Sequence, residues 1–65
     1  MEKWRGDCIG KMHIHGINQT EVANKLGVRR DYLNKVLNGK LNPKNARKRI
    51  ENAINALILQ KNSEN

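Results

Sequence analysis

The chain has 65 residues, 37% of them hydrophobic, with one Trp, one Tyr and no Phe, so it can bury only a small and mainly aliphatic core. Its 13 Lys and Arg residues against 6 Asp and Glu residues give a net charge of +7, and a single cysteine, Cys8, excludes an intramolecular disulfide. No apolar run approaches the length of a membrane span or a signal peptide, so the composition predicts one cytoplasmic domain over residues 1–65.

Residues 3–14 predict a first helix. Its apolar side chains cover one arc of a helical wheel and are expected to face the core: Trp4, Cys8, Ile9 and Met12. We expect Trp4 to cover the core rather than to stack on nucleic acid, because so few aromatic residues cannot build a stacking platform. Gly6 and Gly10 each weaken the helix by about 1 kcal/mol relative to Ala, so packing must compensate.

Residues 16–27, GINQTEVANKLG, carry the clearest signal of a helix start. Asn18 can accept a hydrogen bond from the first turn, and Glu21, three residues later, can reach back to complete a capping box. The helix is therefore expected to begin near Gln19 and to end at Gly27, where a left-handed backbone is easiest for glycine. Its buried stripe consists of Val22, Ala23 and Leu26.

Residues 30–37 predict a third helix with two distinct faces, which Asn38 and Gly39 terminate. One face is apolar and is expected to pack: Tyr32, Leu33, Val36 and Leu37. The other consists of hydrogen-bonding groups: Arg30, Asp31, Asn34, Lys35 and Asn38. The polar face has no part in packing, which makes it a candidate binding surface.

Residues 43–61 predict a long last helix. Asn42 can cap it, and Pro43 suits the first helical position because its missing N–H has no intrahelical partner there. A broad apolar stripe follows: Ala46, Ile50, Ala53, Ile54, Leu57 and Ile58. No stretch alternates apolar and polar residues over the length of a strand, so the sequence predicts an all-α fold, a small bundle of four or at most five helices.

The basic residues gather in the middle of the chain. Residues 25–49, which we call the basic stretch, hold nine Lys and Arg residues and one acid, Asp31, so they carry +8 while the two ends are close to neutral. Such a field attracts polyanions and accelerates their encounter, although a solvated surface that keeps a protein soluble has the same composition.

Two short helices joined at a glycine, the second with a packed face and a basic face, are the physical description of a helix-turn-helix. Residues 16–43, GINQTEVANKLGVRRDYLNKVLNGKLNP, resemble the Cro and phage-repressor (XRE) family of helix-turn-helix proteins, whose fold is lambda-repressor-like. The residues that match the family's pattern in register are Gln19, Val22, Ala23, Leu26, Gly27, Val28, Leu33, Val36, Leu37, Asn38, Gly39 and Pro43. The resemblance implies a helix-turn-helix core over residues 19–38, with the third helix in the major groove of double-stranded DNA.

The resemblance also implies which side chains read bases. Arg30, Asp31 and Lys35 match positions that face base edges in the family, and Asn34 lies between them on the helical wheel. Arg30 can donate two hydrogen bonds to a guanine, Asp31 can accept one from a cytosine amino group, and Lys35 can reach a guanine or a phosphate. Each well-made base contact discriminates by about 1–3 kcal/mol.

Contacts to the DNA backbone are expected on both sides of that helix. Gln19 matches a family position that contacts the backbone, and Asn38 and Lys40 match the loop that lies along phosphates. The remaining candidates follow from charge or position: Arg29, Tyr32, Lys44, Arg47 and Lys48. These contacts add affinity and salt dependence without sequence information.

Two features depart from the family's pattern. Arg29 stands where Ser or Thr commonly caps the third helix, a loss of about 0.5–2 kcal/mol that Asp31 can partly offset through the helix dipole and that a phosphate contact by Arg29 would explain. The family usually ends in two shorter helices, whereas this chain has one long pattern. Ile58 and Leu59 extend its stripe and are the candidates for a dimer contact, because family members commonly bind as two-fold dimers.

Other chemistry is not expected. His13 and His15 point in different directions on a helix, and Cys8 completes no usual zinc spacing, so neither a metal nor another cofactor is predicted. The sequence has neither a Gly-rich phosphate loop nor a set of nucleophile, base and acid, so it does not predict an enzyme.

The sequence therefore predicts a sequence-specific DNA-binding protein, a transcriptional repressor or regulator of phage or mobile-element type. It would bind a palindromic operator as a homodimer, at least on DNA. The alternative is a helix-turn-helix scaffold that serves as an adaptor or inhibitor and binds a protein or RNA partner through its basic face. That use keeps the fold and the charge but not the reading of bases.

Overall fold

The computed structural model describes residues 2–63, which form four α-helices and no strand. The helices are α1 (Lys3–Ile14), α2 (Gln19–Leu26), α3 (Arg30–Leu37) and α4 (Ala46–Ser63). The expected all-α fold is thereby confirmed, with one undivided last helix. Within the described range, no helix combines the length and the apolar composition needed to cross a membrane.

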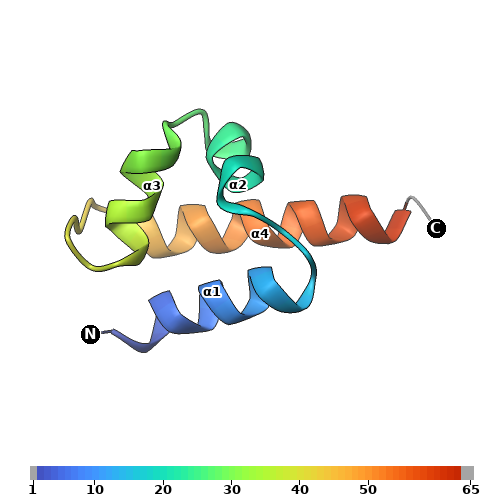
Figure 1. The fold of residues 1–65 in the computed structure, drawn as a ribbon, viewed down its shortest axis with the longest axis horizontal. Coiled ribbons are helices and arrows are strands. Elements are labelled where there is room, and N and C mark those ends of the chain that lie inside the picture. Colours follow the sequence, from blue (N-terminus) through green and yellow to red (C-terminus); the bar gives the residue numbers. More distant parts are fainter. Residues whose placement is uncertain (1, 64–65) are drawn as a thin grey trace.

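The helices pack as two pairs (Figure 1). α1 and α4 run side by side in the same direction, and α2 and α3 lie together above them in this view. α2 packs against both α3 and α4, whereas α3 contacts α1 more than it contacts α4. The α2–α3 unit therefore packs against the other two helices, and α3 lies at the edge of the bundle.

The core receives side chains from all four helices. Those that are almost completely buried are Val22, Leu33, Val36, Leu37 and Ile54. Trp4 is 6% exposed and covers the core as expected, with Cys8 and Met12 beside it on α1. Ile9, which the wheel also directs to the core, is 44% exposed because it lies at the edge of the apolar arc, beyond the buried Arg5.

The start of α2 is held by local hydrogen bonds, as predicted. Glu21 N donates to Asn18 Oδ1 at 2.8 Å, and Asn18 N donates to Glu21 Oε1 at 3.1 Å, which completes the capping box. Gly27 ends the helix with a φ of 74°, in the left-handed region, and Val28 N donates back to the Ala23 carbonyl at 3.0 Å. Residues next to one another in sequence thus fix the turn into α3.

The start of α4 differs from the sequence-based expectation. The helix spans Ala46–Ser63 instead of residues 43–61. Asn45 has a φ of 64°, a left-handed conformation that a helix cannot contain, so the helix begins only after it. The side chain of Asn42, the expected cap, accepts a hydrogen bond from Arg5 Nη2 at 3.1 Å instead. A contact from a distant helix therefore replaces the predicted local cap.

Candidate nucleic-acid interface

α3 presents the two faces that its sequence predicts. Leu33, Val36 and Leu37 are 1% exposed and fix the helix to the core. The hydrogen-bonding side chains lie on the exposed side: Arg30, Asp31, Asn34, Lys35 and Asn38. Tyr32, which the wheel places on the packed face, is 41% exposed because it lies at the rim of that face.

Side-chain amides join the start of α2 to the polar face of α3. Asn34 Nδ2 donates to Gln19 Oε1 at 3.3 Å, and Asn38 Nδ2 donates to Asn34 Oδ1 at 3.0 Å. We call these three residues the amide row. Arg30 and Asp31 line an open depression together with Gln19 and Asn34. Predicted site residues from two helices therefore form one continuous polar surface.

The first turn of α3 has no side-chain cap. Arg29 occupies the cap position with an extended backbone and makes no capping hydrogen bond. Its Nε lies 3.4 Å from Asp31 Oδ1, and the two side chains are 88% and 65% exposed. An ion pair so exposed contributes about 0–1 kcal/mol to stability. Either side chain can therefore leave this pair and bind another ligand at little cost in free energy.

The segment after α3, residues 38–42, folds back on the end of the helix, and we call it the α3–α4 loop. Lys40 N donates to the Lys35 carbonyl at 2.9 Å, and Gly39 has a φ of 80° that permits the reversal. The side chains of Asn38 and Lys40 are exposed on this loop. The loop continues the polar face beyond the last turn of α3.

Arg5 of α1 lies beneath this loop and is absent from the predicted site. The residue is only 3% exposed. Its Nε donates to the Val36 carbonyl at 2.8 Å, Nη2 donates to Asn42 Oδ1 at 3.1 Å, and Nη1 donates to Glu2 Oε1 at 2.6 Å. The guanidinium also lies 4.7 Å from the centre of the Trp4 ring. Its one sequence signal is its position within the core arc of α1, next to that tryptophan.

Two carboxylates at opposite ends of this surface have lowered pKa values. The hydrogen bond from Arg5 is the main cause that holds the pKa of Glu2 below its ordinary value. The backbone N–H of Asn18 has the same effect on the pKa of Glu21, and Lys61 Nζ, 3.2 Å from that carboxylate, adds to it. Both carboxylates are therefore held in their ionised form by groups that also fix local structure.

A comparison with protein families identifies the α2–α3 unit. A family model described as Helix-turn-helix matches residues 15–47, just over half of the chain. The chain belongs to the Cro/C1-type helix-turn-helix family. This is a DNA-binding family, and the ligand of the class is double-stranded DNA. Comparisons with curated proteins and with solved structures give no match.

The helix-turn-helix carries cations with few acidic partners. Within residues 2–63, two of the nine Lys and Arg residues of the basic stretch lie in ion pairs, Arg29 and Arg47. The remaining seven have no ion-pair partner among these residues: Lys25, Arg30, Lys35, Lys40, Lys44, Lys48 and Arg49. α3 and the α3–α4 loop therefore keep a positive field toward an anionic ligand.

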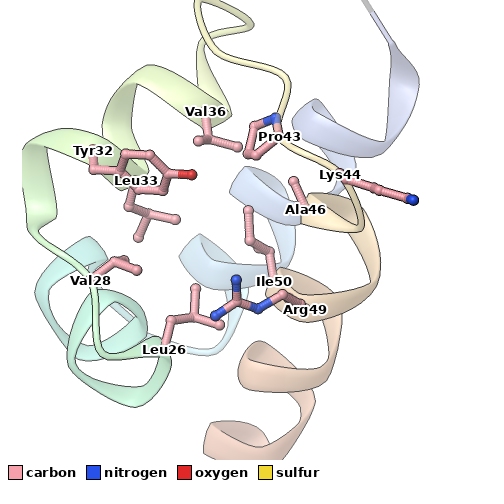
Figure 2. A pocket seen from close by; sticks show the side chains of 10 residues that line it. All are labelled: Leu26, Val28, Tyr32, Leu33, Val36, Pro43, Lys44, Ala46, Arg49 and Ile50. Carbon is pink, nitrogen blue, oxygen red and sulfur yellow. The ribbon is translucent and has the colours of Figure 1, made fainter.

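The basic residues at the start of α4 do not form one patch. Arg47 Nε lies 3.4 Å from the Glu51 carboxylate, one turn later, on the side of α4 that faces α1. Lys48 is exposed. Arg49, which the predicted set omits, lines a hollow between the helix-turn-helix and α4. Figure 2 shows its guanidinium and the Tyr32 hydroxyl pointing toward this hollow, while Lys44 extends away. The other walls are apolar: Leu26, Val28, Leu33, Val36, Pro43, Ala46 and Ile50.

The two predicted dimer residues differ in exposure. Leu59 is 67% exposed, whereas Ile58 is partly buried and packs against the core. A partner helix would therefore meet Leu59 first.

The residues considered for metal binding do not come together. Cys8 is buried, and burial raises the pKa of its thiol, while His13 and His15 are exposed. Among residues 2–63, no three His, Cys, Asp or Glu side chains gather in a group that could hold a metal ion. Cys8 contributes to the core as a small apolar side chain.

Proposed function

We propose that this helix-turn-helix protein is a sequence-specific transcriptional regulator, of the repressor type found in phages and mobile elements. The observation that carries the proposal is the amide row, which links α2 to α3 across an exposed surface bordered by cations that have no acidic partner within residues 2–63. α3 would enter the major groove, and α2 would cross the backbone. The assignment to mobile elements rests on the family resemblance and the small size alone.

Base reading would fall to the exposed side chains of α3: Arg30, Asp31, Asn34 and Lys35. Arg30 has no hydrogen-bond or ion-pair partner within residues 2–63, so its guanidinium is available for a bidentate contact with guanine. Asp31 would exchange Arg29 for a cytosine amino group, which leaves Arg29 to a phosphate. The other proposed phosphate contacts are Gln19, Tyr32, Asn38, Lys40, Lys44, Arg47 and Lys48.

The proposal includes a homodimer on DNA. Leu59, which follows the partly buried Ile58, offers an exposed apolar contact near the end of α4. A two-fold dimer places two recognition helices in half-sites about one helical turn apart, so its operator is a palindrome.

Selection of bound sites from a pool of random duplexes tests the proposed function. We expect a palindromic consensus, and we expect a random duplex to compete far less well than the consensus at every salt concentration. A random duplex that displaces the protein as effectively as the selected site would contradict sequence-specific regulation.

A second candidate function is supported by the hollow between the helix-turn-helix and α4. Its apolar walls suit an apolar side chain, and Arg49 with Lys44 complements acidic neighbours, so the occupant would be an acidic protein segment rather than RNA. The protein would then act as an adaptor or inhibitor. Titration with an acidic peptide that carries one Leu should show binding that Arg49→Ala removes, and no binding to the wild type contradicts this candidate.

A further inference from the structure

We propose that Arg5 is a positioning residue for DNA binding, which clamps the α3–α4 loop from the inside so that Asn38 and Lys40 face phosphates on the outside. The inference rests on the proposed function, because the position of the loop matters for binding only where DNA lies along it. Arg5 is 3% exposed, so it acts through the loop and not by its own contact with DNA.

The clamp connects both ends of the loop to α1. Arg5 Nε donates to the carbonyl of Val36, in the last turn of α3, at 2.8 Å across 31 residues of sequence. Arg5 Nη2 donates to Asn42 Oδ1 at 3.1 Å across 37 residues. Val36 and Asn42 bracket the loop, so one guanidinium fixes where the loop leaves α3 and where it turns toward α4.

The loop has little else to hold it in place. Every residue from 38 to 42 is exposed, so no side chain of the loop anchors it in the core. Within the part of the chain that the structure describes, the Lys40 backbone and the Asn38 side chain bond only to α3 itself. Among residues 2–63, Arg5 alone connects the loop to another helix by a hydrogen bond.

The chemistry of the site requires arginine. A buried guanidinium is stable only where its N–H groups have acceptors and its charge is compensated. Here a carbonyl, an amide oxygen and the Glu2 carboxylate accept from three different nitrogens, and the Trp4 ring covers the cation. The negative end of the α3 dipole lies at the same point. Lysine has no planar fork that reaches acceptors in three directions.

The test compares Arg5→Met with Lys3→Met, which removes the same charge from an exposed position of α1. Binding to the selected duplex is measured across a salt series, at a temperature where circular dichroism shows each variant to be fully folded. We expect Arg5→Met to weaken binding about tenfold and to lower the salt slope by about one phosphate contact. Lys3→Met should leave both values close to those of the wild type.

A double-mutant cycle separates positioning from a purely structural role. Lys40→Ala should weaken binding by the wild type but have almost no further effect in Arg5→Met, because the loop is already displaced. Gln19→Ala, at the other end of the surface, should weaken both backgrounds equally. Folded Arg5→Met with wild-type affinity and salt slope overturns the clamp, as do additive losses with Lys40→Ala.

A second variant keeps the test valid if Arg5→Met does not fold. Asn42→Ala removes the outer anchor at an exposed position and should give a smaller loss of affinity that is again coupled to Lys40→Ala. An additive result overturns the clamp. Wild-type protein that prefers no duplex sequence contradicts the proposed function instead, whereas discrimination by the wild type with no effect at Arg5 or Asn42 contradicts only the clamp.

Discussion

The two ends of the proposed DNA-binding surface are held by different means. At the start of α2, Asn18 and Glu21 bond to each other's backbone N–H groups and lie three residues apart. At the end of α3, the α3–α4 loop depends on Arg5, whose acceptors Val36 and Asn42 are 31 and 37 residues away. A helix start can be stabilised by its own sequence, whereas a loop without buried side chains depends on another helix.

The largest expected effect removes the packing on which both ends depend. Leu33 is 1% exposed at the centre of α3, and Leu33→Ala should destabilise the fold by about 2–5 kcal/mol through lost burial and a cavity. Urea unfolding followed by circular dichroism measures the loss. Ile14→Ala, at a residue 79% exposed, is the control and should change stability by no more than about 0.5 kcal/mol. Equal effects of the two substitutions would contradict the assigned core.

The next effect concerns the surface between the two ends. Arg30→Ala should relax the preference at one base pair by about 1–3 kcal/mol, because a bidentate contact is lost. Lys44→Ala should weaken all duplexes alike and lower the salt slope by about one. Competition with singly substituted duplexes distinguishes the two results. Equal losses on every duplex from both variants would refute the assigned roles.

The capping box at the start of α2 can be removed by itself. Asn18→Ala should destabilise the protein by about 1 kcal/mol, because it removes the oxygen that accepts from the first turn of α2. Thr20→Ala, at an exposed position in the same turn, is the matched control. Combined with Arg5→Met, the losses in unfolding free energy should add to within about 0.5 kcal/mol. A larger interaction energy would show that the two ends are not independent.

The uncapped start of α3 offers a converse test, in which a local cap is added. Arg29→Ser should stabilise the fold by about 0.5–1 kcal/mol by capping the helix. The same substitution should weaken DNA binding and reduce the salt slope by about one if Arg29 contacts a phosphate. Thermal unfolding and a salt titration give the two values, and greater stability with unchanged affinity would refute the phosphate contact.

The smallest expected effect is the loss of stability in acid, when the carboxylates at the two ends of the surface are protonated. The pKa values of Glu2 and Glu21 are lowered below the ordinary 4.5, so each carboxylate stabilises the fold above that value, and its contribution is lost as the pH falls through the folded pKa. Unfolding curves measured between about pH 6 and pH 3 should show this loss. Glu2→Gln and Glu21→Gln should each remove part of it, and an unchanged pH profile in both variants would contradict the shifts.

Most of the fold follows from neighbouring residues. The capping box at Asn18, the left-handed end at Gly27 and the two faces of α3 are confirmed, because each depends on residues a few positions apart. The predicted start of α4 is wrong, since it treats Asn42 as a cap without knowledge of Arg5. Ile9 is misplaced because an apolar arc does not show where its own edge lies.

The candidate site, like the fold, can be predicted from the sequence only in part. The helical wheel places Arg30 and Asn34 on the exposed face of α3, and the structure confirms that position while their contacts with DNA stay predictions. The phosphate contact of Arg47 stays a prediction. A run of basic residues does not reveal that Arg47 pairs with a carboxylate on the side of α4 that faces α1, or that Arg49 lines the hollow next to the helix-turn-helix.

The sequence by itself determined the limits of α2 and α3, the packed and polar faces of α3, and membership of the helix-turn-helix family. These properties depend on periodicity and on caps, which act over about one turn of helix. Only the tertiary structure decided that Arg5 is buried beneath the α3–α4 loop and that Asn42 bonds to it. A charged residue in a helix is normally solvated, and its burial depends on acceptors that only the folded chain brings together.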